Sequence, residues 1–156
     1  MTKFLVIVDC QKDFNNTTET EQIISNLVKK IKSESANTRY LLTADIYHGA
    51  LRDKNQNIDS RIINSLPPNP FIIIKNSFGS EELMECLNFF VEEGDEIEFV
   101  GLFTDICVIS CVLMARTKFF NKKIIISCDS NCCAGTTQEK HQMALEIMKS
   151  CDIIIK

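Results

Sequence analysis

Three residues of complementary chemistry each follow an apolar segment of the chain, namely Asp9, Lys75 and Cys107. A carboxylate can take and return a proton, a thiolate is a strong nucleophile, and a neighbouring ammonium stabilises a thiolate. Each type also has an ordinary role, because aspartate favours turns, lysine is mostly solvated and free cysteine packs as a small apolar group. If the fold brings the three together, they form a site for nucleophilic catalysis.

Cys107 is placed where a strand runs into a helix. The apolar run 96–100 leads into the turn 101–105, and apolar residues then recur at the i, i+3, i+4 and i+7 spacing of a helix, at Val108, Cys111, Val112 and Ala115. A thiol in the first turn of a helix lies beside unpaired N–H groups and the positive end of the helix dipole, which stabilise thiolate. The same N–H groups could hold a developing oxyanion.

Strands and helices alternate along the chain that must position these residues. Apolar strands are predicted at 3–10, 39–44, 71–74, 96–100, 123–128 and 152–155. Four helices are predicted. One spans 19–32, one begins after the N-cap Ser80, one follows Cys107, and one begins at a capping box of Thr136 and Glu139 and ends at Lys149. Strands that are apolar throughout are buried on both faces. We therefore expect a mainly parallel sheet of about six strands covered by helices, in one domain over 1–156.

In such sheets ligands bind beyond the carboxyl ends of the strands. The polar residues predicted at that edge are Asp9, Asp45, Lys75, the turn of Cys107 and Asp129. An acid, an ammonium and a thiol can converge there, and their complementary types make a shared site more credible than any one residue alone.

The composition excludes several classes of protein. A chain of 156 residues with a net charge of −4 has no general attraction for nucleic acid or anionic membranes. No apolar stretch approaches the roughly 20 residues of a membrane span, and the first apolar run is too short for a signal peptide. We therefore expect a cytoplasmic protein without nucleic-acid or membrane partners.

The chain contains eight cysteines. Without secretion a disulfide scaffold is not expected, and Cys10, Cys86, Cys111 and Cys128 stand in apolar contexts where thiols pack as small apolar groups. Cys128, Cys132 and Cys133 cluster in sequence, but their spacing is not that of paired zinc knuckles, so structural zinc is disfavoured.

Four motifs follow one another along nearly the whole chain. They are Asp9-Cys10-Gln11-Lys12-Asp13-Phe14, the segment Lys75 to Ser80, Gly101-Leu102-Phe103-Thr104-Asp105-Ile106-Cys107-Val108, and the element from Asp129 through Ala134-Gly135, Glu139 and His141 to Ala144-Leu145. In this order they resemble the isochorismatase-like cysteine hydrolases, the superfamily that includes nicotinamidases.

The resemblance implies a three-layer α/β/α Rossmann-like fold and a catalytic triad of Asp9, Lys75 and Cys107. It also implies an oxyanion hole made by the backbone N–H groups of Phe103 and Cys107, with a cis peptide between Leu102 and Phe103. The implied activity is hydrolysis of the C–N bond of a small amide through a thioester, since relatives that act on isochorismate lack the cysteine. A homo-oligomer, either dimer or tetramer, is implied as well.

The middle of the chain departs from the nicotinamidase pattern. Those relatives usually carry D-x-H after the second strand and a further histidine, which hold a metal. Here the segment reads Asp45-Ile46-Tyr47-His48, the stretch 49–69 is abbreviated, and no second histidine comes before Lys75. Asp45 and His48 are thus weak metal candidates, because two ligands make a poor site. We expect no required cofactor: a divalent metal could bind, but is not expected.

Two further expectations concern the substrate pocket and the last helix. Phe14, Tyr47 and His48 are predicted to line a pocket for a small planar substrate, although aromatic residues at such spacings are more often part of a core. His141 is expected to pack or cap beneath the turn of Asp129 and to take no part in catalysis.

Three functions from different classes remain open on the sequence. The first is a cysteine amidohydrolase acting on a small carboxamide or carbamoyl compound, which the intact set of Asp9, Lys75 and Cys107 favours. The second is a catalytically silent relative that serves as a binding or assembly module. The third is a thiol redox or metal-binding protein that uses its many cysteines. Dependence of activity on Cys107 alone would separate the first from the third.

Overall fold

The computed structural model describes residues 1–46 and 57–156. Its sheet strands are β1 (Lys3–Val8), β2 (Thr38–Asp45), β3 (Phe71–Lys75), β4 (Glu96–Leu102), β5 (Ile125–Ala134) and β6 (Ile154–Ile155). Its helices are the short turn η1 (Lys12–Phe14), α1 (Thr18–Ser33), α2 (Ser60–Ile63), α3 (Glu81–Phe90), the π-helical turn η2 (Thr104–Val108), α4 (Ile109–Lys118) and α5 (Gln138–Ser150).

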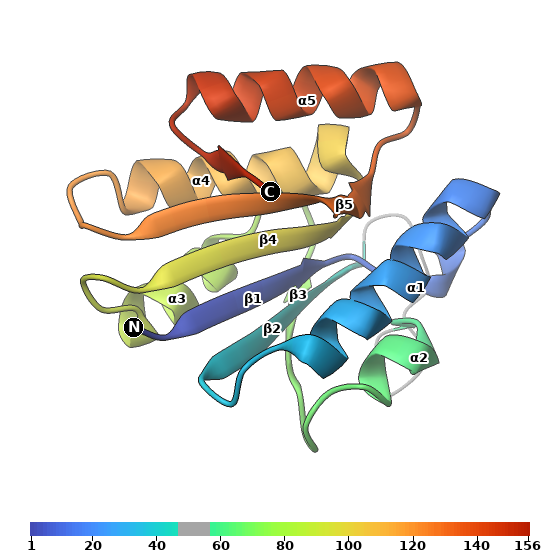
Figure 1. Cartoon of the computed structure of the whole chain (residues 1–156), viewed down its shortest axis with the longest axis horizontal. Helices are drawn as coiled ribbons and strands as arrows, with labels where there is room; N and C mark the ends of the chain where they lie inside the picture. Colours follow the sequence, from blue (N-terminus) through green and yellow to red (C-terminus); the bar gives the residue numbers. More distant parts are fainter. Residues whose placement is uncertain (47–56) are drawn as a thin grey trace.

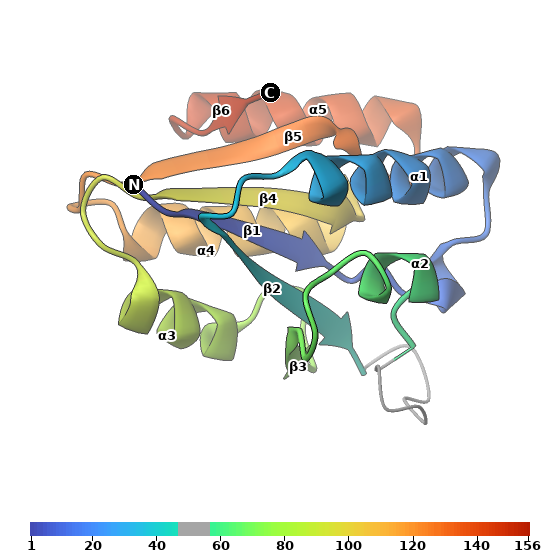
Figure 2. The ribbon, with the colours of Figure 1, turned by 60° about the horizontal axis from the view of Figure 1, so that its bottom comes forward.

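The six strands form one sheet in the order β3-β2-β1-β4-β5-β6, and every neighbouring pair is parallel. Helices α1 and α2 cover one face, while α3, α4 and α5 lie side by side on the other (Figures 1 and 2). The predicted three-layer α/β fold is confirmed. Because all strands are parallel, their carboxyl ends meet at one edge, the end to which the arrowheads point in Figure 1.

The central strands are buried on both faces, as their largely apolar sequence predicts. Every residue of β1 from Phe4 onward is buried, and so is every residue of β4 after Glu96. Gly101 of β4 lies opposite Val8 of β1 and has a φ of +124°. A Cβ at this position would lie 2.1 Å from the carbonyl oxygen of Val8, so only glycine fits.

One buried carboxylate in β4 joins several elements. Glu98 is fully buried and forms ion pairs with the ammonium groups of Lys3, Lys30 and Lys156, which come from β1, α1 and the end of the chain. Although burial opposes ionisation, these ammonium groups hold the pKa of Glu98 below its usual value. The carboxylate therefore stays ionised inside the layer between α1 and the sheet.

Several predicted boundaries differ from the structure. Helix α2 was not predicted, since its four residues are too few to show a helical period. Strand β5 extends six residues beyond the predicted end at Cys128, so Asp129 lies within the strand and not at its carboxyl end. The Asp129 carboxylate accepts a hydrogen bond from Lys30 Nζ at 2.8 Å. Asp129 therefore does not belong to the site predicted at the carboxyl edge of the sheet.

The start of α5 is also displaced from its prediction. Its N-cap is Thr137, whose side chain accepts from the N–H of Lys140, so the predicted capping box of Thr136 and Glu139 is wrong by one residue. The hydroxyl of Thr136 binds another partner, described below. Among the residues that the structure describes, no helix combines the length and the apolar character needed to cross a membrane.

Candidate active site

Asp9, Lys75 and Cys107 come together at the carboxyl edge of the sheet, as predicted. Asp9 directly follows β1, Lys75 is the last residue of β3, and Cys107 lies in η2 just beyond β4. Lys75 Nζ lies 2.7 Å from Asp9 Oδ2 and 3.5 Å from Cys107 Sγ. The ammonium thus links the carboxylate to the thiol.

The contacts around the ion pair fix its geometry. Thr43 Oγ1 donates a hydrogen bond to Asp9 Oδ1 at 2.6 Å, and Lys75 Nζ also donates to the carbonyl oxygen of Ser77 at 2.8 Å. The side chains of Asp9 and Lys75 are 0% and 1% exposed. Asp9 itself has a φ of +47°, in the left-handed region, which turns the chain sharply after β1. Sequence reasoning missed Thr43, whose only signal was a hydroxyl near the carboxyl end of a strand that is otherwise apolar from Leu41 to Ala44.

The protonation states follow from burial and from these neighbours. Burial raises the pKa of Asp9 against the opposing effect of Lys75, whereas the pKa of Lys75 is raised despite its burial, because Asp9 stabilises the ammonium. Burial and the Asp9 carboxylate together raise the pKa of the Cys107 thiol above its ordinary value, and Lys75 only partly offsets them. Cys107 is therefore a protonated thiol beside the Asp9 carboxylate in the resting state, and not the thiolate that its place near a helix start had suggested.

The turn that carries Cys107 has unusual backbone geometry. The peptide bond between Leu102 and Phe103 is cis, as the resemblance implied. The carbonyl oxygen of Phe103 accepts from the N–H groups of Ile106 and Val108, at 3.0 and 3.1 Å, and this closes the π-helical turn. Cys107 thus lies in a wide turn that precedes α4, and not in the first turn of a regular α-helix as predicted.

The segment around the start of α5 holds this turn from a second side. Asp105 accepts hydrogen bonds from the backbone N–H and the hydroxyl of Thr136, at 2.7 and 2.6 Å. His141 Nδ1 lies 2.8 Å from Thr104 Oγ1, and both residues are buried. The expectation that His141 packs beneath the turn of Asp129 is wrong, because α5 directs its ring toward the nucleophile turn.

The predicted substrate-binding residues are only partly described. Phe14 packs edge-to-face against Phe103, with ring centroids 5.8 Å apart, which places an aromatic surface beside the proposed oxyanion hole. Tyr47 and His48 lie outside the described residues.

The described part of this site contains one candidate cluster for a metal, and the ammonium of Lys75 contacts two of its members. Among residues 1–46 and 57–156, the one cluster with metal-ligand spacing is Asp9, Asp45 and Cys107, whose ligand atoms lie within 4.8 Å of one another. The ammonium of Lys75 already neutralises Asp9 and contacts Cys107, so a divalent cation would have to displace it. The backbone of Asp45 is held by the side-chain amide of Gln11, at 2.8 and 3.1 Å. The second metal candidate, His48, falls in the segment that the structure does not describe.

The other cysteines show no metal site in the described residues. Cys10, Cys111, Cys128, Cys132 and Cys133 are buried, as packed apolar thiols would be. Cys128 Sγ and Cys133 Sγ lie 3.7 Å apart without a disulfide, and neither belongs to a described cluster with metal-ligand spacing.

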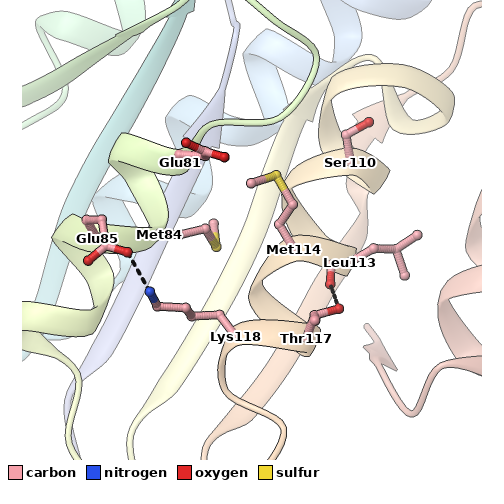
Figure 3. A pocket seen from close by; sticks show the side chains of 8 residues that line it. All are labelled: Glu81, Met84, Glu85, Ser110, Leu113, Met114, Thr117 and Lys118. Atoms are coloured by element: carbon pink, nitrogen blue, oxygen red, sulfur yellow. Dashed lines mark hydrogen bonds and ion pairs between the residues drawn. The ribbon is translucent and has the colours of Figure 1, made fainter.

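A separate groove of about 650 Å³ lies between α3 and α4 (Figure 3). Met84 and Met114 reach toward each other across it, and Lys118 pairs with Glu85 at its edge, at 2.5 Å. No residue of the triad lines this groove. It is therefore distinct from the site at the carboxyl edge of the sheet.

Comparisons with known proteins agree with the fold. The family model of the Isochorismatase domain matches residues 3–155. The pyrazinamidase of Pyrococcus horikoshii in complex with zinc is 21% identical, with a TM-score of 0.75 over 100% of this chain and 99% of its own. The nicotinamidase of Staphylococcus aureus is 23% identical, with a TM-score of 0.73 over the whole of both chains. The nicotinamidase/pyrazinamidase of Bacillus subtilis is 18% identical, with a TM-score of 0.75 over 99% of each. Comparison with curated proteins finds no match.

Proposed function

This chain belongs to the isochorismatase domain family, and we propose that it hydrolyses the C–N bond of a small amide through a thioester on Cys107. The observation that carries the proposal is the buried contact of one ammonium with both a carboxylate and a thiol, from Lys75 to Asp9 at 2.7 Å and to Cys107 at 3.5 Å. This set supplies a proton acceptor, a nucleophile and a fixed positive charge.

In the first half-reaction the thiol loses its proton as it attacks. Asp9 takes the proton from Cys107, the sulfur bonds to the amide carbon, and the carbonyl oxygen becomes an oxyanion. The backbone N–H groups of Phe103 and Cys107 would stabilise that oxyanion. Asp9 then returns the proton to the nitrogen, the C–N bond breaks, and ammonia or an amine leaves. Burial raises the pKa of Asp9, which makes its carboxylate a stronger base for taking the thiol proton than an exposed aspartate.

The second half-reaction regenerates the thiol. Asp9 takes a proton from a water molecule that attacks the thioester carbon, and the C–S bond breaks. The products are a carboxylic acid and Cys107 with its proton restored. Throughout, Lys75 stays charged and limits the build-up of negative charge between Asp9 and the sulfur, as its raised pKa supports. Phe14 and Phe103 favour a planar substrate, since their rings offer a flat apolar surface.

The activities of structurally similar proteins support an amide as the substrate class. Those from Bacillus subtilis and Staphylococcus aureus are nicotinamidases, and the one from Pyrococcus horikoshii is a pyrazinamidase. At 18 to 23% identity the likeness to them shows the fold alone, so the choice among amides has to come from experiment.

The proposal is tested by release of ammonia from a panel of small aromatic and aliphatic carboxamides. We expect activity in the wild type, none in Cys107→Ala, and nearly full activity in the matched control Cys111→Ala, whose thiol is buried one helical turn further on. Hydroxylamine should trap the acyl group as a hydroxamate. Lack of ammonia release from every amide would favour a binding module, and equal losses in both cysteine variants would favour thiol redox chemistry.

A further inference from the structure

The nucleophile turn makes a buried polar contact that the proposed chemistry does not use. Thr104 Oγ1 and His141 Nδ1 lie 2.8 Å apart, and the two residues are 0% and 5% exposed. His141 lies in the first turns of α5, which begins at the same end of the molecule as the tip of β5 (Figure 1). The contact therefore joins the last long helix to the strand-end region that holds the site.

Thr104 occupies a sensitive place in the backbone. It directly follows Phe103 and precedes Cys107 by three residues, so it stands between the two N–H groups of the proposed oxyanion hole. The carbonyl oxygen of Phe103 is already held by the N–H groups of Ile106 and Val108. The hydrogen bond between the Thr104 side chain and His141 restricts the rotation of the peptide groups before and after Thr104.

Core packing alone does not require a polar pair here. Burying a hydroxyl and an imidazole costs free energy that an apolar pair of similar volume would avoid. Burial also lowers the pKa of His141, against the opposing charges of Glu19 and Asp105, so the ring is neutral at neutral pH. A neutral imidazole can form a directional hydrogen bond with Thr104 without placing a second buried charge near the thiol.

We propose that His141 is a positioning residue that acts through Thr104 to hold the N–H groups of Phe103 and Cys107 in line with the developing oxyanion. This inference rests on the proposed amide hydrolysis. Asp105 and Thr136 hold the same turn on its outer side, where they are more exposed. The two pairs together attach the turn to the segment 136–141 at successive residues, Thr104 and Asp105.

The variants His141→Asn and His141→Gln separate positioning from packing. The amide of asparagine can occupy the place of Nδ1 and keep the bond to Thr104, whereas the longer glutamine places its amide near the position of Nε2. Thr104→Val removes the hydroxyl with little change of volume, and Thr104→Ser keeps it. Gln142→Ala, at an exposed neighbour on α5, is the matched control.

The expected result is a loss in kcat without a matching change in KM. We expect kcat to fall roughly tenfold or more in His141→Gln and in Thr104→Val, because displaced oxyanion donors cost rate in the transition state. His141→Asn and Thr104→Ser should keep kcat close to that of Gln142→Ala. The double variant Thr104→Val/His141→Gln should lose no more than either single variant, because both remove one interaction.

Alkylation of Cys107 by iodoacetamide provides the readout that distinguishes positioning from general damage. Alkylation at a saturated carbon forms no oxyanion, so its rate at Cys107, measured by mass spectrometry of the Cys107 peptide, should be unchanged in every variant. A parallel fall of kcat and alkylation would overturn the proposal, since it would indicate a displaced thiol or a poorly folded chain. An unchanged kcat in both His141→Gln and Thr104→Val would overturn it as well.

A second probe keeps the two proposals distinguishable. Benzaldehyde adds to a thiol to give a hemithioacetal: the C–S bond forms and the thiol proton passes to the carbonyl oxygen. We expect benzaldehyde to protect Cys107 from iodoacetamide in the wild type and His141→Asn, and less strongly in His141→Gln and Thr104→Val. If no amide is hydrolysed but protection differs in this way, the proposed function fails and the positioning role stands. Equal protection in all variants, or none in any, would overturn the positioning role.

Discussion

The ion pair of Asp9 and Lys75 should contribute to stability as one unit, although the proposed mechanism gives the two residues separate roles. At 2.7 Å and an effective dielectric constant of about 20, two unit charges attract by roughly 6 kcal/mol. The loss of hydration on burial offsets much of this attraction. Removing one partner leaves the other charge buried and uncompensated, whereas removing both leaves no charge to compensate.

We therefore expect Lys75→Met and Asp9→Asn each to lower the free energy of unfolding by about 3 to 5 kcal/mol at pH 7. The double variant Asp9→Asn/Lys75→Met should lie within about 1 to 2 kcal/mol of the wild type, because buried pairs are often replaced at little net cost. The hydroxyl of Thr43 keeps an acceptor in the variants that carry Asp9→Asn, since the amide oxygen of the new side chain can take the position of Oδ1. All three variants should release no ammonia.

The assay is urea unfolding at pH 7, followed by circular dichroism, with ammonia release measured on the same samples. Glu146→Gln is the matched control, because Glu146 and Lys149 form an exposed ion pair on α5 and its loss should leave the unfolding midpoint unchanged. A double variant as unstable as the two single variants combined would refute the reasoning, because the two charges would then contribute independently.

Three further outcomes follow from the described contacts. Asp9→Asn should speed the alkylation of Cys107 by iodoacetamide at pH 7 while abolishing ammonia release, because Asp9 raises the pKa of the thiol; slower alkylation, measured by mass spectrometry, would contradict this. Dialysis against a chelator should leave ammonia release unchanged, because Lys75 already supplies the positive charge between Asp9 and Cys107; loss of activity that zinc, iron or manganese restores would contradict it. Glu98→Gln should destabilise the protein by roughly 2 to 4 kcal/mol at neutral pH. Because the pKa of Glu98 is lowered in the fold, the wild type should lose this advantage progressively as pH falls below the ordinary glutamate pKa of about 4.3, so urea midpoints whose separation does not narrow as pH falls would contradict the assignment.

The parts of the site that the sequence predicted are those set by strand direction. Apolar strands imply a parallel sheet, and a parallel sheet brings residues that follow different strands to one edge, so Asp9, Lys75 and Cys107 were found without knowledge of side-chain contacts. Local pattern also predicted Ser80 as the N-cap of α3, because its hydroxyl accepts from the N–H of Leu83 within the same turn.

Three of the wrong predictions have the same cause, which is competition from distant partners. Thr136 and Thr137 are equivalent as caps in the sequence, but Asp105 binds Thr136 from 31 residues away and leaves the cap to Thr137. The sequence predicts Asp129 at the end of a strand because it is the first charged residue after an apolar run. In the structure the strand continues past Asp129, whose carboxylate pairs with Lys30 of α1. The pKa of Cys107 also depends on Asp9, which opposes the effect expected from a helix terminus.

The close approach at Gly101 has a consequence for protein engineering. Any side chain there would push β4 away from the carbonyl of Val8, and so would separate the strand that leads to Cys107 from the one that leads to Asp9. Libraries intended to change amide preference should therefore keep Gly101 fixed. Diversity belongs at Phe14, which borders the site from the short turn after β1, where altered side chains leave the spacing of β1 and β4 intact.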